Sequence, residues 1–168
     1  MKKIGIIFLL LIVVLSNGCQ NSSAPDEFVI YFNSFESDSD ITGWSGVTKE
    51  SMEKTACPNG GNSSLHISGG CIQPAASLEL SNISEGNYKI SFWAKMGQSS
   101  QSALIVLAIS EHSSESDKLA IPVTGNNWKY YESDNRLRVA PNQKLQLDIF
   151  VGGIIYADIF LDNIVIEK

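Results

Sequence analysis

Hydrophobic and polar residues follow a short β-type pattern from Phe28 to the end of the chain. The apolar or alternating runs are separated by Gly, Asn, Ser, Asp and Pro, and no helical 3.6-residue periodicity of useful length is present. The runs predict strands at roughly 28–33, 46–53, 63–68, 71–80, 87–96, 102–110, 118–123, 128–139, 143–151 and 155–166. So many strands in one domain indicate an all-β fold, an antiparallel β-sandwich or barrel.

Alternation within single runs predicts which side chains share a face of a strand. In the run 143–151, one face is apolar and the other carries Gln146, Asp148 and Phe150. In the run 87–96, the alternation leaves Trp93 and Lys95 opposite an apolar face. The run 103–109 is apolar on both faces, which predicts a strand covered from both sides.

The first residues have the pattern of a targeting segment. A basic start at 1–4 precedes an apolar run at 6–15, which is too short for a comfortable membrane span and is typical of a signal peptide. Gly18 before Cys19 predicts a bacterial lipoprotein processing site, although Ser16 stands where leucine is usual. We therefore expect a signal peptide at 1–18 and a lipidated Cys19; an ordinary secretory signal is the alternative.

Residues 19–27 are polar, small and proline-containing, as expected of a tether between a lipid and a folded domain. No acid directly follows Cys19, which resembles sorting to the outer membrane, with either a periplasmic or a surface-exposed domain. The remaining 28–168 is the size of one domain with a sizeable core, since single domains typically hold about 100–150 residues.

The net charge of the chain indicates which classes of binding partner are disfavoured. The formal net charge is −6, and removal of the signal peptide with its two lysines makes the rest more acidic. An acidic surface disfavours nucleic acid and anionic lipid headgroups. Attachment to a membrane is therefore expected to come from the lipid anchor rather than from a basic patch.

One acid interrupts the apolar pattern of the last strand. Asp162 lies in a run of β-branched and aromatic residues that predicts a buried strand. A buried carboxylate costs several kcal/mol unless it is hydrogen-bonded, paired or bound to a metal. Asp162 is thus expected to have a partner.

Six short stretches share the order and spacing of one family's motifs: Phe35-Glu36, Gly43-Trp44, Gly61-Asn-Ser-Ser-Leu-His-Ile67, Tyr88-Lys-Ile-Ser-Phe-Trp-Ala-Lys95, Trp128-Lys-Tyr-Tyr131 and Leu161-Asp-Asn-Ile164. Together they resemble the carbohydrate-binding modules of the CenC type, which have a galactose-binding-like jelly roll. Asn163 replaces the second aspartate of the family's Asp pair. The resemblance implies an antiparallel jelly roll that binds a polysaccharide or oligosaccharide.

The resemblance also implies a structural calcium ion at one edge of the sandwich. Carried over to this chain, its ligands are the side chains of Glu36 and Asp162 with main-chain oxygens near Ser34 and Asn62. Carboxylates and carbonyls are the ligands that calcium prefers. The alternative is that Glu36 is a surface acid and Asp162 caps backbone amides at a bulge.

The candidate sugar site is a surface with an aromatic ring beside hydrogen-bonding groups. Trp93 and Lys95 supply one strand of it. If the adjacent strand presents Gln146, Asp148 and Phe150, the combined surface resembles the concave cleft of glycan-chain binders. His66 is a further candidate for the same face; the alternative is a structural histidine. The alternative is a covered face in which Trp93 belongs to the core.

Two further cysteines, Cys57 and Cys71, flank a turn and a strand. An extracytoplasmic location permits a disulfide between them, which would stabilise the fold by about 3 kcal/mol through closure of the loop. With only His66 and His112 elsewhere, these cysteines do not have a zinc-binding spacing.

No catalytic signature accompanies these features. Gly-x-Ser-x-Gly is absent, and the acids form no recognisable glycosidase motif. The sequence therefore favours a non-enzymatic, lipid-anchored carbohydrate-binding protein of the cell envelope. The alternative is an envelope protein whose jelly roll mediates adhesion or assembly through protein contacts.

Overall fold

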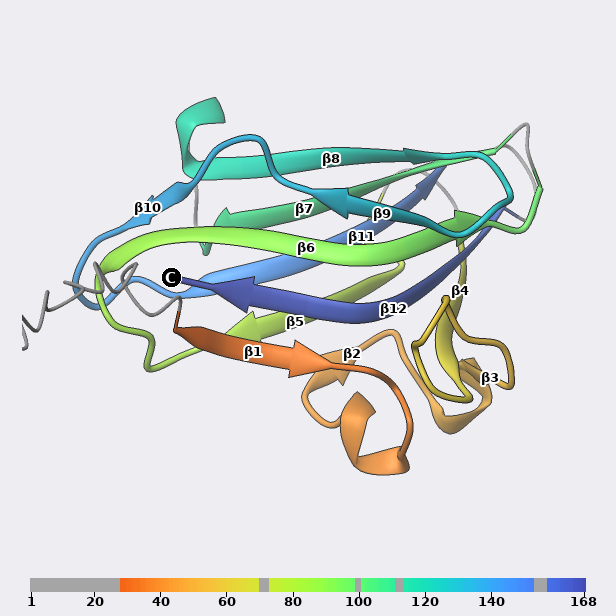
Figure 1. Ribbon diagram of the computed structural model, residues 1–168. Coiled ribbons are helices and arrows are strands. Elements are labelled where there is room, and N and C mark those ends of the chain that lie inside the picture. Colours follow the sequence, from red (N-terminus) through yellow and green to blue (C-terminus); the bar gives the residue numbers. More distant parts are fainter. Residues whose placement is uncertain (1–27, 70–72, 99–100, 111–113, 153–156) are drawn as a thin grey trace, which may run out of the picture.

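The computed structural model describes residues 28–69, 73–98, 101–110, 114–152 and 157–168. These residues form a sandwich of two antiparallel sheets, as the sequence predicted (Figure 1). Within the described ranges, no helix is long and apolar enough to cross a membrane. The predicted signal peptide, Cys19, the tether and Cys71 lie outside the described residues.

The seven-stranded sheet is built around two long central strands. Its main order is β10 (Leu137–Val139), β6 (Gly86–Met96), β12 (Ala157–Glu167), β4 (Ser64–Gly69) and β3 (Met52–Glu53). In addition, β1 (Val29–Asn33) pairs with β12 and β9 (Lys129–Glu132) pairs with β6. The two halves of β12 thus have different neighbours on one side, β4 and β1.

The five-stranded sheet packs behind it with the order β2 (Trp44–Ser45), β5 (Ala76–Leu80), β11 (Leu145–Gly152), β7 (Ser102–Ile109) and β8 (Lys118–Thr124). Three short 3-10 turns connect strands: η1 (Asp38–Ile41), η2 (Lys49–Ser51) and η3 (Glu115–Asp117). In Figure 1, β8 and β9 lie along the upper edge and β1 along the lower edge of the sandwich.

The core lies between the sheets and follows the alternation in the sequence. On β11, Leu145, Leu147, Ile149 and Val151 are fully buried. On β6, the inward residues are Tyr88, Ile90, Phe92, Ala94 and Met96, all at most 1% exposed. Burial of alternate residues from both sheets is the main stabilising contribution to such a sandwich.

Two predicted strands are wrong in detail. The run 46–53 forms η2 and β3 instead of one strand, because Gly46 has a positive φ of 76° and a Cβ there would collide with the Ala75 carbonyl oxygen. The run 128–139 divides into β9 and β10. Between them Ser133 Oγ donates a hydrogen bond to the Asn135 carbonyl oxygen at 2.9 Å, which stabilises a turn.

The last strand contains a β-bulge at the acid that the sequence singled out. Asp162 pairs with Trp93 and Val165 pairs with Ser91, so β12 holds one residue more than β6 between these pairs. Asn163 in the bulge has a positive φ of 46°. Bulges re-aim side chains, and this one turns Asp162 to the end of the sandwich where Glu36 lies.

Candidate functional site

The residues predicted to share one sugar-binding surface lie on two opposite faces. Trp93 and Lys95 are on β6 of the seven-stranded sheet, whereas Asp148 and Phe150 are on β11 of the five-stranded sheet. His66 on β4 accompanies the first pair, and Gln146 accompanies the second. The predicted single surface is therefore wrong, because β6 and β11 are not neighbouring strands.

On the outer face of the seven-stranded sheet, aromatic rings are occupied by neighbouring side chains. Phe160 on β12 stacks on His66 from β4, with ring centroids 4.6 Å apart. From β6 on the other side, Lys95 Nζ lies 4.7 Å from the Phe160 centroid. The same ammonium group lies 5.1 Å from the Trp128 ring. These stacking and cation–π contacts use ring faces that a sugar would need.

Trp93 and Tyr130 lie beside this group on adjacent strands. Trp93 is half-buried and makes an edge contact with Tyr130, with centroids 5.9 Å apart and an interplanar angle of 61°. Tyr130 is 47% exposed. Trp93 is thus on an outer face rather than in the core, but its ring is in contact with the Tyr130 ring. Trp44, by contrast, is buried and packs against Phe35.

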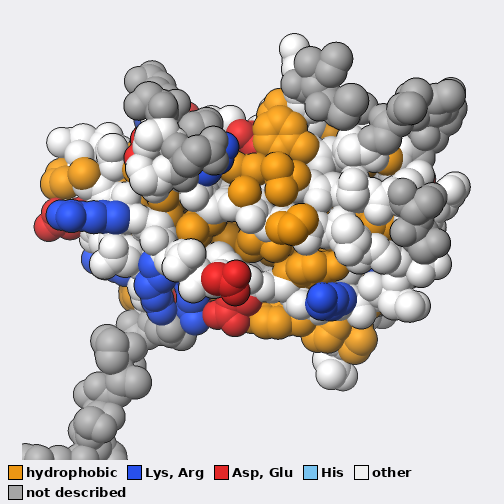
Figure 2. Space-filling view, turned by 90° about the horizontal axis from the view of Figure 1, so that it is seen from above, with side chains coloured by type: hydrophobic (Ala, Val, Ile, Leu, Met, Phe, Trp, Pro, Cys, Tyr) orange, Lys and Arg blue, Asp and Glu red, His pale blue; other side chains and the backbone are white. Residues whose placement is uncertain are grey.

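The outer face of the five-stranded sheet carries an apolar strip across three neighbouring strands. Phe150 on β11 pairs with Leu104 on β7, and Leu104 pairs with Pro122 on β8. Leu104 is 38% exposed and Pro122 is exposed. Figure 2 looks onto the edge formed by β8 and β9, where apolar side chains gather in the middle of the view; the outer face of the five-stranded sheet is seen only edge-on there. In the described part of the chain, no ring or cation occupies Phe150.

Next to this strip, Asp148 is held by two hydrogen bonds to one of its oxygens. Ser77 Oγ on β5 donates to Asp148 Oδ1 at 2.6 Å, and Gln146 Nε2 donates to the same oxygen at 2.9 Å. No described residue donates to Asp148 Oδ2. The side chain is 8% exposed. The arrangement therefore fixes a carboxylate whose second oxygen can accept a ligand hydroxyl beside an apolar strip.

The predicted metal ligands Glu36 and Asp162 converge on one glycine turn. Glu36 Oε1 accepts hydrogen bonds from the Asn62 and Ser63 amides at 2.9 and 3.0 Å, and these bonds lower the pKa of Glu36. A Cβ at Gly61 would collide with Glu36 Oε1, and a Cβ at Gly60 would collide with Asp162 Oδ2. Glycine is thus required for the close approach of both carboxylates.

Asp162 is fully buried and caps two backbone amides. Its Oδ2 accepts from Cys57 N at 2.9 Å and its Oδ1 from Asn163 N at 2.7 Å. Burial raises the pKa of Asp162, and the Glu36 charge adds to this rise, whereas the two hydrogen bonds oppose it. Capping at a bulge, one of the two roles considered from the sequence, is therefore present.

This donor set fits a hard cation. The carboxylates of Glu36 and Asp162 face the same turn and repel each other, and a cation near both would relieve that repulsion. The main-chain N–H of Asn62 donates to Glu36 Oε1 at 2.9 Å, so this nitrogen is not available to a cation. A cation ligand from Asn62 would be a carbonyl oxygen. No third Asp, Glu, His or Cys completes a metal cluster in the described residues. Main-chain oxygens and water would have to supply the rest.

Cys57 in this turn is a buried free thiol among the described residues. Asn163 Nδ2 lies 3.4 Å from Cys57 Sγ, and Asp162 is an acceptor beside it. Burial raises the pKa of the thiol to about 12, and the Asp162 charge contributes to this rise. The thiol is therefore engaged with the bulge of β12. Cys71 itself lies outside the described residues.

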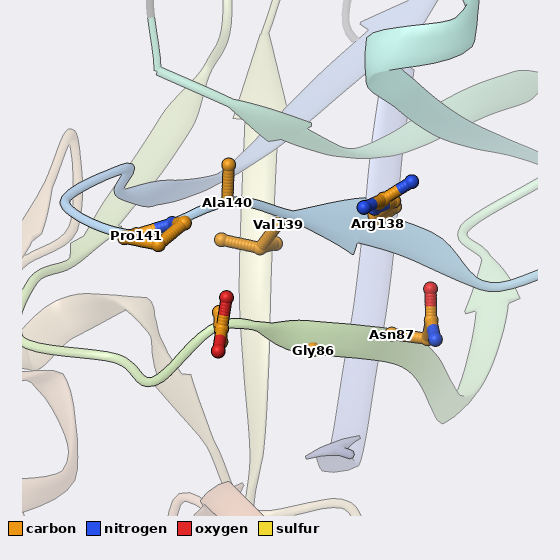
Figure 3. A pocket seen from close by; sticks show the side chains of 7 residues that line it. Gly86, Asn87, Arg138, Val139, Ala140 and Pro141 are labelled. Carbon is orange, nitrogen blue, oxygen red and sulfur yellow. The ribbon is translucent and has the colours of Figure 1, made fainter.

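A small open hollow lies at the opposite end of β6 (Figure 3). Its volume is about 210 Å³, and it is lined by Glu85, Gly86, Asn87, Arg138, Val139, Ala140 and Pro141. No aromatic side chain lines it, so it lacks the flat surface on which a sugar ring stacks. The strip with Phe150 is the better candidate for a sugar.

Residues 28–154 match the family model of a carbohydrate binding domain. The chain belongs to this family. A comparison with curated proteins found no match. The carbohydrate binding domain assignment agrees with the jelly-roll architecture and with the resemblance read from the sequence.

Several solved structures of similar fold are carbohydrate-binding modules. The xylan-binding CBM22-1 domain of Xyn10C from Paenibacillus barcinonensis is 19% identical, with a TM-score of 0.58 over 84% of this chain and 94% of that one. The CBM22-1 and GH10 modules of a Clostridium thermocellum xylanase, in complex with xylohexaose, are 15% identical, with a TM-score of 0.60 over 84% of this chain and 29% of that one. TmCBM61 in complex with beta-1,4-galactotriose is 16% identical, with a TM-score of 0.51 over 75% of this chain and 88% of that one. At these identities the likeness shows the fold.

Several residues of the candidate site were not identified from the sequence. Ser77, Leu104 and Pro122 join it through strand pairing between residues far apart in the chain. The one signal available was the run 103–109, whose apolar residues on both faces indicate an outer side that is not fully solvated. Strand order, which decides these neighbours, is not encoded in the alternation of one strand.

Proposed function

We propose that this protein binds a glycan chain, without catalysis, on the outer face of its five-stranded sheet. The observation that carries the proposal is Asp148, fixed by Ser77 and Gln146 through one oxygen and left with the other as an acceptor. The strip of Phe150, Leu104 and Pro122 lies beside it. Apolar surface stacks on the C–H faces of sugar rings, while Asp148 accepts from hydroxyls.

The proposed substrate class is a neutral polysaccharide or oligosaccharide. The structures with similar folds hold xylohexaose and beta-1,4-galactotriose, which are uncharged chains. A strip that crosses three strands offers an extended surface rather than a closed pocket for a single sugar. The net charge of −6 also disfavours acidic polysaccharides.

We further propose that the domain is displayed at the cell envelope as a lipoprotein, with Cys19 lipidated and 19–27 as its tether. The support is the sequence of 1–19, with its basic start, apolar run and small residue before cysteine. The location would be the outer membrane. Membership of a carbohydrate-binding family gives the adhesion or assembly alternative no support.

Calcium is proposed as a structural ion at Glu36 and Asp162, with no part in sugar contact. The support is the convergence of two carboxylates on the Gly60-Gly61 turn and the charge repulsion between them. Thermal unfolding in calcium and in chelator tests it. A higher melting temperature in calcium, abolished by Glu36→Gln, supports the site, and equal melting temperatures contradict it.

Affinity electrophoresis tests the glycan proposal. The protein is run through gels containing soluble β-glucan, xylan, galactan, mannan or pectin, as wild type, Phe150→Ala, Asp148→Asn and Trp93→Ala. We expect retardation by at least one neutral polymer, lost in Phe150→Ala and weakened in Asp148→Asn, but kept in Trp93→Ala. Circular dichroism establishes that each variant is folded.

Each other outcome has a definite meaning. Retardation lost in Trp93→Ala and kept in Phe150→Ala would move the site to the seven-stranded sheet. An absence of retardation by every polymer, from folded wild type, would contradict glycan-chain binding. Trp93→Ala and Phe150→Ala control for each other, since each removes a half-buried ring from an outer sheet face.

A further inference from the structure

Strand β1 is an outer strand with an unusual composition. It pairs with β12 and with no other described strand. Its five residues, Val-Ile-Tyr-Phe-Asn, include no charge and no proline. An apolar edge strand of this kind tends to be covered in its native setting, because its free backbone groups and side chains otherwise recruit other chains.

The other outer strands of the described structure are protected. Pro122 and Lys118 lie in β8, and Arg138 lies in β10. Lys129 and Glu132 flank the tyrosines of β9. The strands β2 and β3 have two residues each. By comparison, β1 has five residues with neither a charge nor a proline, and its one irregularity is a register shift between Val29 and Tyr31.

Exposed apolar side chains gather at β1. Phe28 is 68% exposed and Phe32 is 60% exposed, the two highest values among the large hydrophobic residues described, and Val29 is 46% exposed. The inward side of the strand is firmly fixed, since Tyr31 Oη accepts hydrogen bonds from Asn33 Nδ2 at 2.8 Å and Trp44 Nε1 at 3.0 Å. The exposed rings therefore belong to a rigid strand and not to a frayed end.

The position of this patch in the chain indicates what covers it. Phe28 follows Cys19 by nine residues, which span at most about 30 Å when extended. A lipid on Cys19 would thus keep Phe28, Val29 and Phe32 close to the bilayer. Phenylalanine at an interface is stabilised by burial among the lipid headgroups and the upper acyl chains.

We propose that the β1 patch, defined by Phe28, Val29 and Phe32, docks on the phospholipid bilayer that carries the Cys19 anchor. This inference rests on the proposed lipid anchoring but not on sugar binding. In the sequence, acids stand on both sides of β1, with Asp26 and Glu27 before Phe28 and Glu36 after Asn33, so contact with the bilayer would come from the apolar side chains and not from charge.

The depth of the patch can be measured in the lipidated full chain. Phe32→Trp and, as a matched control, Leu104→Trp each replace an exposed apolar side chain by tryptophan on different sheets. The proteins are reconstituted into vesicles of phosphatidylethanolamine and phosphatidylglycerol, with or without brominated acyl chains. Unsubstituted protein supplies the background emission of Trp44, Trp93 and Trp128.

We expect the emission added by Phe32→Trp to shift to shorter wavelength and to lose intensity in brominated vesicles, while that added by Leu104→Trp does neither. Adding Phe28→Ser to Phe32→Trp should reduce both effects. Protein that floats with vesicles but shows equal emission from the two tryptophans overturns the docking alone. A blue shift that depends on protein concentration, without bromine quenching, overturns it in favour of pairing between copies of the chain.

Flotation separates anchoring from docking. Protein that does not float lacks the lipid anchor, which overturns both anchoring and docking and leaves the glycan proposal intact. Retardation in polysaccharide gels is measured on Phe32→Trp with and without Phe28→Ser, because neither Phe32 nor Phe28 belongs to the proposed sugar surface. Leu104→Trp is left out of this measurement, because Leu104 does belong to it. Loss of retardation together with intact quenching would contradict the glycan proposal alone.

Discussion

At the scale of a residue, the buried carboxylate of Asp162 is stabilised by hydrogen bonds and destabilised by burial and by a neighbouring charge. Two backbone amides donate to its oxygens, which compensates part of its desolvation. Burial nevertheless raises its pKa, and the nearby Glu36 charge adds to the rise. The balance means that the protonated form is favoured in the folded state relative to the unfolded state.

The sign of this shift gives a testable pH dependence. A raised folded pKa contributes stability below the unfolded value, near 3.8, and that contribution is lost as pH rises through the folded pKa. In calcium-free buffer, the stability advantage of wild type over Asp162→Asn should be greatest near pH 4, at about 1–3 kcal/mol, and should shrink toward pH 7. Urea unfolding across this range measures it, and an advantage that grows with pH contradicts the assignment.

The residue-scale predictions from sequence succeeded where one residue broke a pattern. An acid in an apolar strand requires a partner, and Asp162 accepts from the amides of Cys57 and Asn163. Its association with Glu36 was implied by the family resemblance, and both carboxylates face the Gly60-Gly61 turn. The disulfide between Cys57 and Cys71 stays a prediction, because Cys71 lies outside the described residues. Cys57 Sγ lies against the bulge at Asn163, a contact that the spacing of the cysteines could not indicate.

At the scale of an element, strand alternation was sufficient to predict faces but not neighbours. The outward set on β11 and the outward pair on β6 are both as expected from the period of two. Their placement in one surface was wrong, since pairing in a jelly roll depends on long connections and on which sheet each strand enters. That information is distributed over the whole chain.

Gly61, in the turn between β3 and β4, can be compared with Gly125, in the turn between β8 and β9. Gly61 and Gly125 have φ values of +93° and +86°, so alanine at either is strained by about 1–2 kcal/mol. A Cβ at Gly61 would also collide with Glu36, whereas nothing lies within 4 Å of a Cβ at Gly125. We expect Gly61→Ala to destabilise the fold more than Gly125→Ala, by an additional 1 kcal/mol or so.

Chemical denaturation of the two variants measures this difference. Equal losses would mean that the Glu36 carboxylate moves aside at no cost, so that its contact with the turn is not stabilising. Repeating the measurement with Glu36→Ala in each background assigns the difference to that side chain by a double-mutant cycle, because alanine removes the atoms that the Cβ would meet.

At the scale of the whole molecule, the acidic surface determines how binding should respond to salt. Neutral glycans have no charge to attract or repel, so their affinity for the five-stranded sheet should be nearly unchanged when salt is raised. An acidic polymer such as pectin should be repelled at low salt by the net charge of −6, and less so at high salt.

Retardation in gels of each polymer at two salt concentrations measures this response. A neutral polymer whose retardation falls steeply with salt would contradict a binding surface based on apolar contact and hydrogen bonds. Bovine serum albumin, run alongside as an acidic protein without glycan affinity, corrects for the effect of salt on the gel itself.

The two ends of the domain are adjacent. Lys168 N donates a hydrogen bond to the Phe28 carbonyl oxygen at 3.0 Å, and β1 continues from there along β12 (Figure 1). A mechanical load transmitted through residue 28 therefore acts on the end of a strand pair, and its bonds would open one after another from Phe28 toward Asn33. Under tension between a cell surface and a bound polymer, β1 would peel away first, while β11 and β7, which carry the proposed sugar surface, keep their own pairing.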